Sequence, residues 1–121
     1  MDKYQALHGF WSGFDLPAYD ENTVPETAVM PYITYEAVGD SFDSRNMLSA
    51  SLWYYSLSWS EISQKSDEVS ESIGMGGMMI PYDGGALWVS RGTPFAQRMS
   101  DQDPEIRRVL LNIEVEYLSV D

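Results

Sequence analysis

Residues 58–73, with the sequence SWSEISQKSDEVSESI, have the pattern of a single amphipathic helix. One face recurs at helical spacing and is formed by Trp59, Ile62, Ser66, Val69 and Ile73. Ser58 followed by Glu61 fits a capping box, with Ser58 as the N-cap and Glu61 reaching back to its backbone N–H. Gly74, the first of three glycines, is a typical helix C-terminus. The pattern predicts a helix over about 59–73.

Two strands are predicted on the N-terminal side of this helix. Residues 32–38 (YITYEAV) are rich in β-forming residues, and residues 39–46 have the composition of a turn or loop. Residues 47–57 alternate, so Leu48, Ala50, Leu52 and Tyr54 face one side and Ser49, Ser51, Trp53 and Tyr55 face the other. The two runs should form an antiparallel hairpin.

The segment after the helix predicts a second hairpin and a long final strand. Residues 78–82 are predicted to form a short strand, in which Pro81 favours an edge position. Asp83-Gly84 is a hairpin turn, and residues 86–91 form the second strand of the hairpin. Residues 92–104 are expected to be a loop. Residues 106–118 alternate and place Glu114 and Glu116 on the face opposite an apolar one. One half-polar face indicates an antiparallel sheet with one covered side, for which the 59–73 helix is the natural cover.

Residues 1–31 are predicted to form a short helix and an extended arm. The helix pattern is carried by Tyr4, Leu7, Phe10, Trp11 and Phe14 and is weakened by two glycines. Three prolines make residues 15–31 an extended loop or arm. The 121 residues are therefore expected to form one α+β domain. Its core, residues 32–118, is an antiparallel sheet of about four to five strands packed against one main helix.

The charge and composition of the chain limit its function. With 19 Asp and Glu against 7 Lys and Arg, the net charge is −12, which disfavours tight binding to nucleic acid or to an anionic membrane. Either the acidic residues only keep the protein soluble, or they form an acidic face that lines a passage for DNA. There is no cysteine, no signal-peptide pattern and no apolar run long enough for a membrane span. We therefore expect a cytosolic protein until assembly.

Catalytic, cofactor and metal signatures are not found in the sequence. His8 is the single histidine, and no Gly-x-Ser-x-Gly motif accompanies it. The glycine-rich segment 74–78 lacks the Gly-Lys-Ser/Thr end of a phosphate loop. The acids at Asp40 and Asp43, and at Asp101 and Asp103, do not follow calcium-loop spacing. We predict a non-enzymatic protein with no cofactor.

Aromatic side chains are the strongest candidates for an interaction site. Trp53, Tyr55 and Trp59 lie where the second strand enters the helix, and because neighbours on a strand face opposite ways, not all these rings can share one core. Phe95, in the predicted loop, is a candidate docking residue. Either these rings belong to the core and ordinary surface, or they form a subunit interface, where aromatics are enriched.

The order of elements, with Pro31-Tyr32-Ile33-Thr34-Tyr35 opening the first strand, resembles the tail-terminator (tail-completion, minor tail) proteins of siphophages. In that family a Pro-Tyr-Val/Ile-x-Tyr strand precedes a strand pair, a helix and a final alternating strand, here ending in Arg107-Arg108-Val109-Leu110-Leu111. The resemblance covers roughly residues 31–118.

The resemblance implies a homohexameric ring in the virion, assembled in the host cytoplasm. Such a ring caps the tail tube at its head-proximal end and joins the tail to the head connector, while DNA passes through its lumen without specific binding. Its partners would be copies of itself, the tail tube protein and the connector or stopper protein. The loops at 39–46 and 92–104 would meet the tube or connector, and Glu114 and Glu116 would face the lumen. Two alternatives stay open: a head-completion or stopper protein, and an acidic DNA-mimic or inhibitor module.

Overall fold

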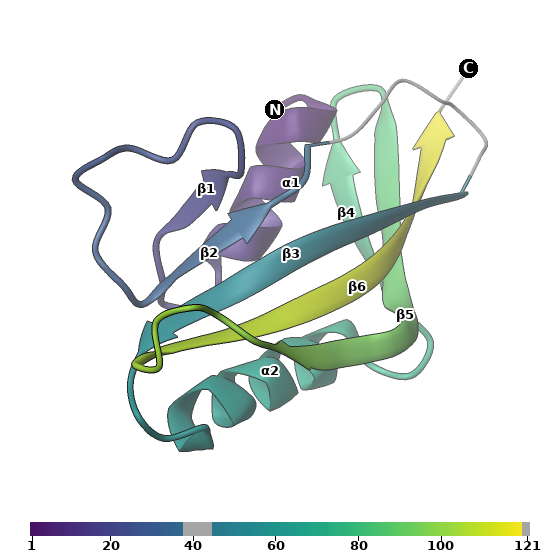
Figure 1. The fold of residues 1–121 in the computed structure, drawn as a ribbon. Coiled ribbons are helices and arrows are strands. Elements are labelled where there is room, and N and C mark those ends of the chain that lie inside the picture. The colour runs from purple at the N-terminus through teal and green to yellow at the C-terminus, as the bar shows by residue number, and fades with distance from the viewer. Residues whose placement is uncertain (38–44, 120–121) are drawn as a thin grey trace.

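The fold, taken from a computed structural model, combines two helices with a six-stranded sheet (Figure 1). The structure describes residues 1–37 and 45–119. The strands lie in the order β1-β2-β3-β6-β5-β4, so the long β3 and β6 form the centre of the sheet. The elements are α1 (Lys3–Ser12), β1 (Ala18–Asp20), β2 (Tyr32–Tyr35), β3 (Arg45–Tyr55), α2 (Ser60–Ile73), β4 (Met78–Tyr82), β5 (Gly85–Met99) and β6 (Ile106–Ser119).

Both helices pack against one face of a curled sheet (Figure 1). Helix α2 contacts β3, β5 and β6. Helix α1 contacts β5 and also β1 and β4, the two outermost strands of the sheet order. The sheet therefore curls around α1. Trp11 of α1 and Ile62 of α2 belong to the same cluster of buried side chains, so the N-terminal helix is part of the core.

The predicted alternation of the two central strands is confirmed by burial. On β3, Leu48, Ala50, Leu52 and Tyr54 are buried, and Trp53 and Tyr55 lie on the other face. On β6, every second side chain from Val109 to Tyr117 is buried. Removing one large apolar side chain from water contributes about 1.5–3 kcal/mol, so this face supplies most of the stability of the fold.

The main helix is confirmed over Ser60–Ile73, but its predicted capping box is wrong. Trp59 occupies the N-cap position without a side-chain cap, and the Ser58 Oγ accepts from the Ser60 N–H at 3.0 Å in a local turn. Gly74 follows the helix with a φ of 76°, a conformation that favours glycine.

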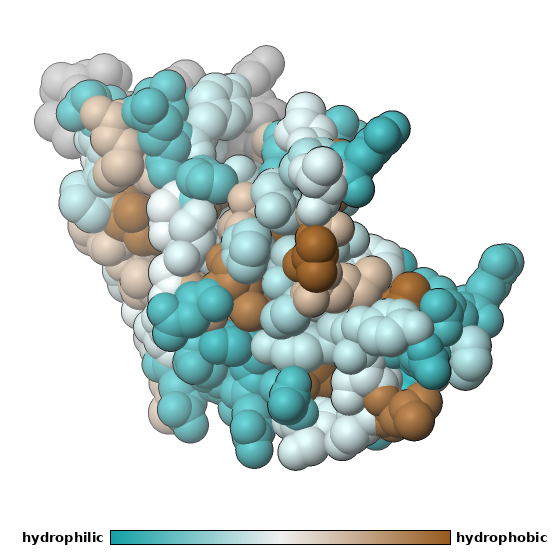
Figure 2. All heavy atoms as spheres, turned by 90° about the vertical axis from the view of Figure 1, so that its left-hand side faces the viewer, coloured by the Kyte–Doolittle hydropathy of each residue, from teal (hydrophilic) through white to brown (hydrophobic). Residues whose placement is uncertain are grey.

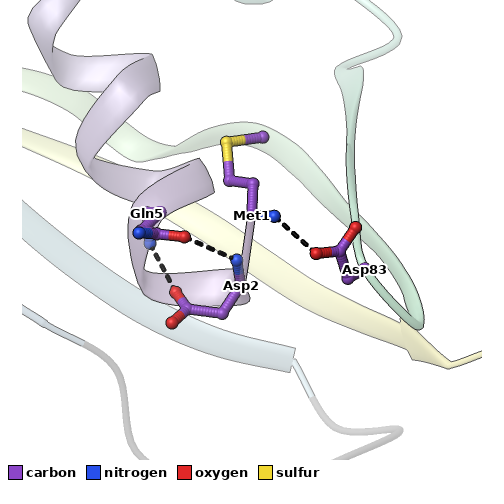
Figure 3. A network of polar contacts seen from close by, with 4 residues as sticks. All are labelled: Met1, Asp2, Gln5 and Asp83. Carbon is purple, nitrogen blue, oxygen red and sulfur yellow. Dashed lines mark hydrogen bonds and ion pairs between the residues drawn. The ribbon is translucent and has the colours of Figure 1, made fainter.

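The capping box of this protein lies instead at the start of α1 (Figure 3). The Asp2 carboxylate accepts from the Gln5 N–H at 2.8 Å, and the Gln5 side chain accepts from the Asp2 N–H at 2.9 Å. The Asp83 N–H donates to the Met1 carbonyl at 2.7 Å, which joins the start of α1 to the turn between β4 and β5. These contacts offset the two glycines that weaken the helix pattern.

Three predictions about the strands need correction. The arm contains a short strand, β1, which pairs in parallel with β2, so the sheet is neither four- to five-stranded nor wholly antiparallel. Residues 92–99 continue β5 instead of forming a loop. Gly92 permits this, because a Cβ there would lie 2.9 Å from the Asn112 carbonyl oxygen of β6. The first predicted strand ends at Tyr35, and most of the predicted 39–46 loop lies outside the described residues.

The second hairpin is confirmed. Strand β4 spans Met78–Tyr82 as predicted, lies at one edge of the sheet and pairs antiparallel with β5. Gly84, in the turn between them, has a φ of 91°. No helix in the described part of the chain is long and apolar enough to cross a membrane.

Candidate assembly interface

The face of the sheet opposite the helices carries a row of stacked side chains from four adjacent strands. Tyr19 of β1 meets Tyr32 of β2 edge to face, with ring centroids 5.7 Å apart. Tyr32 lies 6.5 Å from Trp53 of β3, and the Arg108 guanidinium of β6 lies 4.7 Å above the Trp53 ring. We call these four residues the aromatic row and this face the open face.

Hydrogen bonds fix the centre of the aromatic row. The Trp53 Nε1–H donates to the Thr34 hydroxyl at 2.9 Å, and the Arg108 Nε–H donates to the Ser51 hydroxyl at 3.0 Å. The strand register puts Trp53 opposite both Tyr32 and Arg108, so the rings and the guanidinium share one face. Rigid aromatic and arginine side chains held in this way are typical of protein–protein interfaces, because little side-chain entropy is lost on binding.

An apolar cleft of about 390 Å³ adjoins the aromatic row. It is lined by Ala28, Val29, Met30, Tyr32 and Tyr55. Val29 is 77% exposed and Tyr55 is 62% exposed, values high for apolar side chains. The Tyr55 hydroxyl donates to the Glu105 carboxylate, and this hydrogen bond, with the nearby negative charge, raises the pKa of Tyr55. Seen from the side of the arm, exposed apolar side chains form separate spots among polar ones (Figure 2).

A second apolar cleft, of about 310 Å³, lies between the two helices and β4. Its lining comes from α1, the end of α2 and the edge strand: Met1, Ala6, Gly9, Phe10, Gly13, Phe14, Ser72, Met78 and Ile80. No ionisable side chain lines it, so this cleft offers apolar contact and no obvious chemistry.

Trp59 and Phe95 are not part of the open face. Trp59 lies at the start of α2, where the guanidinium groups of Arg98 and Arg107 approach its ring at 4.7 and 5.2 Å. Phe95 lies in β5, is half-buried and packs against the hydrophobic core, so its description as an exposed loop aromatic needs correction. The structure therefore brings Trp53 and Tyr55 together on one face and places Trp59 and Phe95 elsewhere.

Glu114 and Glu116 lie half-buried on the open face, as their alternation predicts. Glu114 is opposite Met47 of β3 and Ser90 of β5, and Glu116 is opposite Trp88 of β5. The acids and the aromatic row thus occupy different parts of the same surface, with the aromatic row nearer the start of β6.

His8 takes part in a short hydrogen-bonded line on the surface of α1. Its Nδ1 lies 2.9 Å from the Tyr35 hydroxyl, and its Nε2 lies 3.2 Å from the Ser12 hydroxyl. Neither His8 nor Ser12 lines the two clefts above. Within residues 1–37 and 45–119, no group of three or more His, Cys, Asp or Glu side chains is placed to hold a metal ion.

Comparison with known proteins gives a match in fold and none in sequence. No protein-family model matches the chain, and no curated protein matches it. Among solved structures, the chain is similar to one in the virion of a native gene transfer agent (GTA) particle. The TM-score is 0.61 at 16% identity, covering 96% of this chain and 91% of the other. The two chains share a fold. The similarity extends over nearly the whole of both.

The residues that the sequence analysis missed are the partners of the candidate rings. Tyr19, Arg98 and Arg108 contact Tyr32, Trp59 and Trp53 respectively across strands or elements far apart in the chain. Alternation on β6 places Arg108 on the polar face, but only the register between β3 and β6 shows that it lies over Trp53.

Proposed function

We propose that this protein is a structural, non-enzymatic subunit of a phage or phage-like virion. In this proposal it is a tail terminator, which caps the tail tube as a ring and joins the tail to the head connector. The observation that carries the proposal is the shared fold with a virion chain, which covers 96% of this chain. The order of strand pair, helix, hairpin and long final strand, which the structure has, supports the narrower assignment.

The open face supports assembly as the mode of action. It carries the aromatic row, the exposed Tyr55 and an apolar cleft, and neither helix covers it. Aromatic and arginine side chains at the centre of a patch with a polar rim are typical of subunit contacts. A ring requires that one surface of each copy meets a different surface of the next, and this open face would be one of the two.

The acidic character of the chain supports a passage for DNA. With a net charge of −12, the surface repels phosphate, so DNA would move through a lumen without adhering. In this proposal Glu114 and Glu116 face that lumen. The partners would be further copies, in a ring we expect to be a hexamer, together with the tail tube protein and the head connector, at the head-proximal end of the tail.

Electron microscopy of particles made without this protein tests the proposal. We expect overlong or unjoined tail tubes next to filled heads, and restoration of normal particles when the gene is supplied in trans. Normal tails in its absence would refute the proposal. Filled heads that leak DNA, together with copurification of the protein with capsids, would instead support a head-completion protein.

A further inference from the structure

The outer half of β5, residues 91–99, is a strand edge without a strand partner in the described part of the chain. Strand β4 pairs with β5 only from Gly85 to Val89, whereas β6 pairs with β5 as far as Met99. The register with β6 shifts between Arg91 and Ala96, so the regularly paired part of this edge is residues 96–99. Thr93, Pro94, Ala96, Gln97 and Arg98 are exposed. An exposed strand edge presents unpaired backbone N–H and C=O groups, which bind an added strand.

A groove of about 180 Å³ runs between this edge and α2. Its lining is Ser63, Ser66, Asp67, Ala96, Gln97, Arg98 and Val109. The Ser66 Oγ is buried and has no hydrogen-bond partner among the described residues. An unpaired buried hydroxyl destabilises the folded protein, so a polar group that enters the groove and bonds to it would remove that penalty.

The end of this groove is positively charged in a strongly acidic protein. Arg98 and Arg107 both approach Trp59, and no described carboxylate forms an ion pair with either guanidinium. Arg107 donates instead to the carbonyl oxygens of Leu57 and Pro104, at 2.8 and 2.7 Å. Asp67 lines the groove itself, and Glu105 is engaged by Tyr55 on the other face. The charge at this end suits an acidic, extended segment.

The arm of the same chain has that chemistry. Residues 15–31 contain Asp15, Asp20, Glu21 and Glu26 and no Lys or Arg. Most of residues 21–30 are exposed. The Glu21 N–H donates to the Tyr35 carbonyl of β2, and the backbone hydrogen bonds that follow are local, such as the Ala28 N–H to the Pro25 carbonyl. The arm follows β1, at the opposite edge of the sheet order from β4 and β5 (Figure 1). The strands β2, β3 and β6 separate it from the groove of its own chain.

We propose that the arm of one copy, residues 22–30, adds as an extended strand to the outer half of β5 in the neighbouring copy. Glu26 faces the Arg98 and Arg107 end, and backbone groups of the arm satisfy the strand edge and the Ser66 hydroxyl. The contact joins two different surfaces, as a ring requires. The inference rests on the proposed ring and names the segment that links its subunits.

Disulfide cross-linking tests this contact, because the chain has no cysteine of its own. The test variant carries Thr27→Cys in the arm and Gln97→Cys in β5, both exposed positions. The matched control carries Thr27→Cys and Glu71→Cys, which is exposed on α2. Both are assembled with tail tubes, oxidised and run on a denaturing gel, while electron microscopy records rings.

We expect the test variant to give a ladder of covalent oligomers in steps of one copy, and the control to stay monomeric on the gel. Rings seen by microscopy without a ladder would overturn the arm contact and leave the ring proposal standing. Absence of rings from both variants and from the unmodified protein would refute the ring and the arm contact together. A ladder in the control as strong as in the test variant would also overturn the specific contact.

Charge neutralisation gives a second readout. We expect Glu26→Gln to weaken subunit association about twofold to fivefold at low salt, with the difference shrinking as salt is raised. Glu71→Gln removes the same charge from α2 and should leave association unchanged. Equal effects of the two variants would contradict the proposed docking, since they would show a response to net charge alone.

Discussion

The two faces of β3 differ in what covers them, although they alternate along one strand. Leu48, Ala50, Leu52 and Tyr54 are buried beneath the helices. Their neighbours Trp53 and Tyr55 are held on the open face by Thr34, Arg108 and Glu105. The comparison indicates that one face maintains the fold, and we propose that the other serves assembly. Substitutions one residue apart should therefore have different consequences.

The largest effect is expected from Leu111→Ala on the covered face of β6. Leu111 is fully buried, and loss of its side chain leaves a cavity, which should lower the free energy of unfolding by about 2–5 kcal/mol. The matched control is Leu110→Ala, the next residue, on the open face and half-buried. Urea unfolding of both variants measures the difference. Equal losses in the free energy of unfolding would show that the two faces contribute equally to stability.

The second largest effect is expected from alkaline pH, which should lower the free energy of unfolding through Tyr117 on the covered face. Burial raises the pKa of Tyr117, with a smaller contribution from Tyr4, whereas the unfolded chain releases this proton near pH 10.0. Above that pH the unfolded state binds fewer protons than the folded state, so stability falls as pH rises, by up to about 1.4 kcal/mol per pH unit for this group. The free energy of unfolding, measured at each pH from 8 to about 11, should fall less steeply with pH for Tyr117→Phe than for the unmodified protein. An unchanged slope would contradict this assignment.

A smaller loss, about 1 kcal/mol, is expected for Asp2→Ala, because the N–H groups of the first turn of α1 lose their cap. Glu71→Ala removes an exposed acid from α2 without removing a cap and should be close to neutral. Thermal unfolding compares the two. A cost for Glu71→Ala equal to that of Asp2→Ala would show that charge, and not capping, determines the result.

Periodicity in the sequence predicts the central elements because local pattern and burial agree there. The alternation of β6, the helix at Ser60–Ile73 and the β4–β5 hairpin are all found in the structure. The outer half of β5 is missed because Gly92 and Pro94 resemble a loop, although the glycine lets β5 approach Asn112 closely. The short β1 is missed because its three residues gain their pairing only from β2.

The candidate interface is only partly predictable from sequence. Alternation places Trp53 and Tyr55 on the same face, and the structure agrees. The row through Tyr19, Tyr32 and Arg108 depends on strand order and register, which involve residues up to about ninety positions apart and leave no local signal. The same limit applies to the groove beside β5, which exists only once α2 is docked.

The most direct test of the division between the faces is sedimentation velocity of the doubly substituted protein, Trp53→Ala with Tyr55→Ala. The protein is measured by itself and after mixing with isolated tail tubes. We expect a protein that still folds and unfolds cooperatively in urea but no longer forms rings or binds tubes. The contradicting result is a ring population equal to that of the unmodified protein, which would remove the open face from assembly.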